Sequence, residues 1–165
     1  MRVLGIDPGL SATGWGVVAS NGNSFRAVAH GAIRSRTDRS LPERLDEIFT
    51  GLSLVIAQHR PQLAVVEEIF VARNPASALK LGHARGVAIA AACHGGLSVF
   101  EYSALQVKKA VVGYGRAEKH QVQEMVRMLL AMPKQAPMDA ADALAAAVCH
   151  LNQAPLLRLT GQRAS

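Results

Sequence analysis

The chain opens with a short apolar run that ends in an acid, RVLGIDPG at residues 2–9. Such a run is typical of a strand buried on both faces of a sheet. A second run of this kind, LAVVE at residues 63–67, also ends in an acid. Because ligands bind at the carboxyl ends of parallel strands in open sheets, we expect Asp7 and Glu67 to be neighbours there. An acid at a strand end can also simply cap a turn, and for Asp7 taken alone that explanation stays open.

The rest of the pattern predicts one layered fold. Gly9, Gly14 and Gly16 punctuate a turn and a second strand at 13–19, and a third strand is expected at 25–33. Short spacings and turn glycines predict that these strands form an antiparallel meander with the first. A capping box at Ser40 opens a helix whose apolar residues recur at helical spacing. Further strands are expected at 63–66 and 97–102, and further helices at 74–93, 103–112, 118–132 and 138–151. This order predicts an α/β fold with a mixed five-stranded sheet, three strands antiparallel and two parallel, flanked by helices. Right-handed crossovers place the first and fourth strands side by side.

Length and composition indicate one domain, which we place at residues 1–151. Residues 152–165 carry no signal and are expected to form a C-terminal tail, for which order and disorder both stay open. No apolar run is long enough for a membrane span, so we expect no membrane partner. The start of the chain lacks the apolar stretch of a signal peptide, and Cys93 and Cys149 lie far apart. Both features favour the reducing cytoplasm.

Two aspartates stand out in the last predicted helix. Asp139 and Asp142 are the polar exceptions in the otherwise apolar stretch 138–149. Their spacing puts both carboxylates on one helical face, in the first turns, where the helix dipole favours anions. Capping accounts for one of them, but a pair on such an apolar helix must face something polar.

A meeting of all four acids would have a chemical consequence. Two carboxylates ~5 Å apart at an effective dielectric of ~20 repel each other by roughly 3 kcal/mol, so the group needs a proton or a cation. Oxygen ligands favour Mg²⁺ or Mn²⁺, and the sequence has neither a histidine pair nor a cysteine cluster typical of zinc. Carboxylates that hold two such ions hydrolyse phosphodiesters by in-line attack.

The charge balance points the same way. The chain has 18 Lys and Arg residues against 12 Asp and Glu residues, a net charge of +6. A basic domain suits a polyanionic partner, although a merely basic protein would have the same balance. Two stretches of the chain are rich in basic residues and supply candidates for phosphate contacts: Arg73, Lys80 and Arg85 in one, and Lys108, Lys109, Arg116 and Lys119 in the other.

Four sequence blocks carry a family resemblance. They are GIDPGLSATGWG at residues 5–16, VVEEIFVARNPASALKLGHARGVA at 65–88, FEYSALQVKKAVVGYGRAEKHQVQ at 100–123 and DAADALAAAVCH at 139–150. In this order and at this spacing they resemble the bacterial RuvC-type Holliday-junction resolvases. The resemblance implies a ribonuclease-H-like fold and a homodimer that cuts two opposed strands of a four-way DNA junction symmetrically, in recombination and repair. It also implies the branch-migration partners RuvA and RuvB.

The resemblance assigns residues to roles. It makes Asp7, Glu67, Asp139 and Asp142 the catalytic, metal-holding tetrad, with Glu67 rather than Glu68 as the match. It places Lys119 near the scissile phosphate and Lys108 there or along the DNA, although a solvated helix face explains both lysines too. It favours Phe70 as a wedge against unstacked bases, where packing at the strand-to-helix corner is the alternative. Together with Arg73, Lys80 and Arg85, these residues make up the expected DNA-binding set: Phe70, Arg73, Lys80, Arg85, Lys108 and Lys119.

The expected activity is a Mg²⁺- or Mn²⁺-dependent endodeoxyribonuclease with two ions per site, which leaves 5′-phosphate and 3′-hydroxyl ends. Three alternatives stay open. An actin-like kinase or ATPase would also use a GIDxG loop, but it normally needs two such domains, more than 165 residues supply. A junction-binding module would bind without cleaving, and a ribonuclease-H-type enzyme would cut RNA–DNA hybrids with the same acids.

Overall fold

The computed structural model describes residues 1–68 and 74–160, with side chains as far as residue 154. Two predicted DNA-binding residues, Phe70 and Arg73, lie outside the described residues. Within the described residues the strands are β1 (Arg2–Asp7), β2 (Ala12–Ser20), β3 (Phe25–Arg34), β4 (Leu63–Glu68) and β5 (Ser98–Ser103). The helices are α1 (Leu41–His59), α2 (Pro75–His94), α3 (Ala104–Val112), α4 (Lys119–Leu129) and α5 (Met138–Thr160).

The five strands form one mixed sheet in the order β3-β2-β1-β4-β5. β1, β2 and β3 pair antiparallel, whereas β4 pairs parallel with both β1 and β5. The predicted fold class is therefore confirmed, as is the predicted adjacency of the first and fourth strands. Ile6 pairs with Val66, so the acids that follow them stand at the same edge of the sheet.

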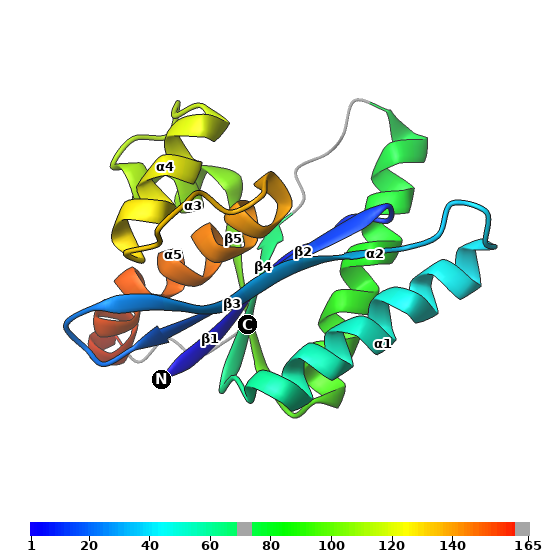
Figure 1. Ribbon diagram of the computed structural model, residues 1–165, viewed down its shortest axis with the longest axis horizontal. Coiled ribbons are helices and arrows are strands. Elements are labelled where there is room, and N and C mark those ends of the chain that lie inside the picture. The colour runs from blue at the N-terminus through cyan, green and yellow to red at the C-terminus, as the bar shows by residue number, and fades with distance from the viewer. Residues whose placement is uncertain (69–73, 161–165) are drawn as a thin grey trace.

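Helices cover both faces of the sheet (Figure 1). α1 and α2 pack on one face, over a core that includes Leu4, Ile6 and Val66. α3, α4 and α5 cover the other face, over a core that includes Val65 and Leu144. Alternate residues of β1 and β4 enter opposite cores, as expected for strands buried on both sides.

α5 approaches the sheet so closely that glycine is required beneath it. A methyl group added at Gly5 would lie 1.8 Å from the carbonyl oxygen of Ala143, and one added at Gly14 would lie 2.0 Å from that of Asp139. Gly14 and Gly16 lie inside β2, in the strand predicted at 13–19. The α5 backbone leaves no room for a side chain at Gly14, and a methyl group added at Gly16 would lie 2.6 Å from the Leu144 side chain. The sequence pattern placed both glycines in a strand but could not show that a helix packs on them.

Two helix ends differ from the prediction. α4 ends at Leu129, and Ala131 takes a left-handed conformation with φ of 49°. α5 continues to Thr160 instead of ending near residue 151, so residues 152–160 of the expected tail are helical. The Asn152 side chain donates a hydrogen bond to the carbonyl oxygen of Ala110 at 3.0 Å, which ties this extension to α3. In the part of the chain that the structure describes, no helix combines the length and the apolar character needed to cross a bilayer.

We predict that Gly14→Ala destabilises the fold by about 1–3 kcal/mol, because a methyl group there displaces the α5 backbone. The control is Gly51→Ala on α1, where the atoms nearest to the added methyl group belong to the Ile33 side chain, at 2.9 Å, and not to the backbone of another element. Chemical denaturation of both variants measures the difference. Equal stability of Gly14→Ala and the wild type would contradict the close packing.

Candidate active site

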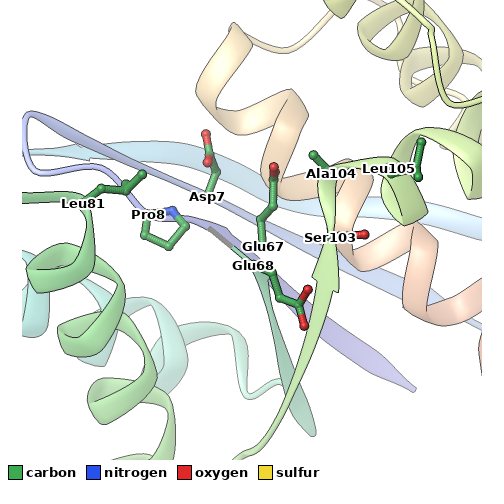
Figure 2. Close-up of a pocket in the computed structure, with 8 residues that line it drawn as sticks. All are labelled: Asp7, Pro8, Glu67, Glu68, Leu81, Ser103, Ala104 and Leu105. Atoms are coloured by element: carbon green, nitrogen blue, oxygen red, sulfur yellow. The ribbon is translucent and has the colours of Figure 1, made fainter. Parts of the chain in front are cut away.

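Asp7 and Glu67 are placed by the two parallel strands at the centre of the sheet. Asp7 ends β1, and Glu67 is the penultimate residue of β4. Their carboxylates point the same way from the sheet edge, and that of Glu68 points the other way (Figure 2). This opposition follows from the alternation of side chains along a strand. The geometry thus separates Glu67, which stands with Asp7, from its neighbour in sequence.

α5 brings the other two acids to the same edge. The helix backbone at Asp139 lies directly against Gly14 of β2, which pairs with Asp7 of β1. Asp142 lies one turn further along and lines a cavity of about 210 Å³ together with Asp7 and Glu67. The close packing of α5 on β1 and β2 therefore sets the position of both aspartates.

The four acids share one electrostatic field. Burial raises the pKa of Asp7 from 3.8 to about 7, and the charges of Asp142, Glu67 and Asp139 add to this effect. Burial, followed by the charge of Asp142, also raises the pKa of Glu67. At neutral pH the site therefore tends to keep a proton, because several carboxylates this close resist full ionisation.

Two lysines face the acids from the helices above them. Lys119, the first residue of α4, places its Nζ 3.3 Å from Oδ2 of Asp142. The charge of Asp142 raises the pKa of Lys119, and Lys119 in turn lowers that of Asp7. Lys108 of α3 lines the same cavity, and its charge offsets part of the rise in the pKa of Glu67. Both lysines are thus within reach of a phosphate bound at the acids.

The other predicted basic residues lie apart from this cavity. Lys80 is exposed on α2. Arg85, also on α2, forms an ion pair with Glu101 of β5 and is mostly buried. A phosphate contact by Arg85 would have to compete with that ion pair. The ion pair could not be predicted from sequence, because Glu101 lies on a different element. Sequence reasoning also missed the lining of a second cavity beside the acids, formed by Pro8, Glu68, Leu81, Ser103, Ala104 and Leu105.

The donor set fits a hard divalent cation. All four acidic side chains offer oxygen alone, and a cation would displace the proton that Asp7 holds near neutral pH. Among residues 1–68 and 74–160, no three His, Cys, Asp or Glu side chains form a ready-made metal site. Mg²⁺ usually keeps several waters and binds one or two carboxylates together with substrate phosphates, so it does not need a complete protein cage.

Comparison with known proteins gives one consistent result. Residues 3–150 match the family model described as crossover junction endodeoxyribonuclease RuvC. A RuvC from Geobacter sp. (strain M21) is 54% identical over 159 residues, covering 96% of this chain and 97% of the relative. One from Syntrophotalea carbinolica is 57% identical over 150 residues, covering 91% and 93%.

The most informative matches among solved structures are also Holliday junction resolvases. Thermus thermophilus RuvC in complex with Holliday junction substrate superposes with a TM-score of 0.89 at 36% identity, covering 94% of this chain and 96% of that one. The yeast mitochondrial Holliday junction resolvase Ydc2 shares the fold alone, with a TM-score of 0.65 at 12% identity. On the extent and identity of these matches, the chain belongs to the RuvC family of crossover junction endodeoxyribonucleases.

Proposed function

We propose that this chain resolves four-way (Holliday) DNA junctions in homologous recombination and repair, by symmetric paired nicks that leave 5′-phosphate and 3′-hydroxyl ends. Family membership supports the reaction class. One observation carries the proposal for the site: the acids from β1, β4 and α5 lie in a shared field that holds the pKa of Asp7 near 7, with two lysines beside them. A protein that only binds junctions would gain nothing from four anions placed where phosphates must approach.

In this proposal Asp7, Glu67, Asp139 and Asp142 hold two Mg²⁺ or Mn²⁺ ions. When bound, such ions supply an activated water and stabilise the leaving 3′ oxygen. Lys119 holds the scissile phosphate and offsets charge in the transition state, as a point charge next to the acids can. Lys108, which lines the same cavity, supports the same phosphate.

DNA outside the cavity would contact a wider basic surface. Lys80 is exposed and free to meet a backbone phosphate. Arg85 contributes only if the DNA draws it from Glu101. Phe70 as a wedge and Arg73 as a phosphate contact remain part of the proposal on the strength of the family resemblance.

Two opposed strands need two active sites, and a homodimer supplies them on a two-fold axis. An exposed stripe of α2 fits close packing against a second copy, because Leu79 is 65% exposed there and Gly82, Gly86 and Ala90 follow at helical spacing. RuvA and RuvB, the family's branch-migration proteins, are the further partners we propose.

Cys93 and Cys149 are both unpaired thiols, which supports a cytoplasmic location.

The function is tested by incubating the pure protein with a synthetic four-way junction, a linear duplex and an RNA–DNA hybrid, with and without Mg²⁺. We expect cleavage of the junction alone, and only with Mg²⁺. Asp7→Asn should bind the junction and cut it at least about 100-fold more slowly. Equal cutting of the linear duplex would contradict the resolvase, preferred cutting of the hybrid would indicate a ribonuclease-H-type enzyme, and binding without any cutting would indicate a pure binding module.

The raised pKa of Asp7 predicts a stability that depends on pH. The folded state favours the neutral carboxyl, so its stabilising effect is complete below pH 3.8 and is lost as the pH rises to about 7. In a chelator, Asp7→Asn should therefore gain stability over the wild type between pH 5 and pH 8, by at most about 4 kcal/mol at the upper end. Added Mg²⁺ should stabilise the wild type at pH 8 more than this variant.

Melting temperatures of both proteins across this pH range provide the measurement. Asp46→Asn, at an exposed acid on α1, is the matched control. If the difference in melting temperature between Asp7→Asn and the wild type did not change with pH, the raised pKa of Asp7 would be contradicted.

Lys119→Ala should slow single-turnover cleavage on the order of 100-fold and weaken junction binding only modestly, because it removes one charge at the reacting phosphate. Lys134→Ala, at an exposed lysine beyond α4, is the control. Unchanged cleavage by Lys119→Ala would contradict this role and would mean that Lys119 is only a solvated lysine on the helix surface.

A further inference from the structure

A cavity of about 360 Å³ lies apart from the acids, between the edge of the sheet and the linker that joins α4 to α5. Residues 27–30 of β3 form one wall, and residues 130–133 of this linker (residues 130–137) form the other. None of these residues lines the cavities at Asp7 and Glu67. The lining side chains are apolar except for His30, and the volume is within the ~300–1,000 Å³ range of ligand sites.

β3 offers a free strand edge at this cavity. It is the outermost strand of the sheet and runs between the α1–α2 layer and the α4–α5 layer (Figure 1). Val28 has no partner residue in β2, and the pairing then continues without interruption from Ala29 to Arg34. In the part of the chain that the structure describes, no strand pairs with the outer side of β3. An edge of this kind can accept a further strand, because its outward N–H and C=O groups lack strand partners.

The linker forms a fixed wall opposite this edge. Leu130 and Met132 are buried in the core. The Arg127 side chain donates a hydrogen bond to the carbonyl oxygen of Met132 at 3.4 Å, and the Gln123 side chain donates one to that of Ala136 at 2.6 Å. A wall held in this way needs little reordering to receive a ligand, which lowers the free-energy cost of binding.

The groove between β3 and the linker, which we call the β3 groove, is basic on both sides. Arg26 and Arg34 are exposed on β3, and Lys134 is exposed on the linker. Among the described side chains, none of these three forms an ion pair. Neither β3 nor the linker contains an acid. Burial, followed by the charge of Lys134, lowers the pKa of His30, so the two walls face each other closely. An acidic ligand complements this groove.

We propose that the β3 groove binds an extended acidic segment of a partner protein, which pairs with β3 as an additional strand and places an apolar side chain in the cavity. Such a site is separate from junction cleavage, because it shares no residue with the cavities at the acids. A partner held there would leave the acids open to DNA.

Two other occupants fit this groove less well. Antiparallel pairing of β3 with the β3 of a second copy about His30 would set Arg26 against Arg34, and like charges opposite each other are destabilising. Duplex DNA matches the basic charge, but its phosphates offer only acceptors, so they cannot pair with alternating N–H and C=O groups. An extended peptide supplies both kinds of group and an apolar side chain as well.

The first test adds a fluorescently labelled peptide, in which valine and glutamate alternate, to the full chain and measures anisotropy. We expect binding that weakens about tenfold or more in the double variant Arg26→Glu with Arg34→Glu, because the added carboxylates repel the peptide. The matched control is Arg60→Glu with Lys109→Glu, at two exposed basic residues on other elements, which should bind the peptide like the wild type. A peptide with lysine in place of glutamate should not bind.

The second test locates the peptide by amide hydrogen exchange. We expect slower exchange within residues 29–34 when the peptide is bound, and no slowing with a peptide whose backbone is N-methylated at alternate residues, because that peptide cannot pair as a strand. Ala29→Phe, which fills the cavity, should also weaken binding about tenfold. Its melting temperature shows whether it folds, and the arginine variants carry the test if it does not.

Several outcomes would overturn the proposed docking site. They are no binding of the glutamate peptide up to about 1 mM, equal binding of the lysine peptide, binding that the double variant leaves unchanged, and unchanged exchange in β3. A loss of four-way junction binding by the double variant, without peptide binding by the wild type, would identify the groove as a DNA surface and would overturn the proposal as well.

Discussion

The close contact between α5 and the centre of the sheet is the constraint on which the site depends. Gly5 and Gly14 let the α5 backbone lie where any side chain would collide with it. Small residues continue on the helix side, where residues 143–147 are buried alanines and one leucine. This packing holds Asp139 and Asp142 against the ends of β1 and β4, which carry Asp7 and Glu67. Sheet and helix thus assemble acids from three distant parts of the sequence.

That assembly stores electrostatic repulsion at the sheet edge. Two arrangements reduce this repulsion in the folded chain: Asp7 stays protonated near neutral pH, and Lys119 lies against Asp142. Both arrangements are reversible: a proton can leave, and a lysine 69% exposed can turn to another anion. A site of this kind is poised to exchange its proton for cations and its lysine contact for a phosphate, which is the exchange that a metal-dependent nuclease requires.

Local patterns in the sequence were sufficient for most of the fold and for the candidate acids. The apolar runs ending at Asp7 and Glu67 predicted adjacent parallel strands, and the structure confirms that pairing. Long-range packing was not predictable in this way. Nothing near Gly14 in sequence reveals the helix packed against it, and the partner of Arg85 lies on a strand 16 positions away. Glu68 follows Glu67 directly, yet its carboxylate points the opposite way because side chains alternate along a strand.

The central claim is that Asp7, Glu67, Asp139 and Asp142 act on one phosphate through shared divalent ions. A crystal structure of the full chain on a four-way junction with uncleavable scissile phosphates, grown with Mn²⁺, tests it most directly through the anomalous signal of the metal. The account predicts Mn²⁺ bound by oxygens of Asp7 and Glu67 and of at least one α5 aspartate, with a scissile phosphate beside it. Mn²⁺ bound elsewhere, or a scissile phosphate distant from these carboxylates, would contradict it.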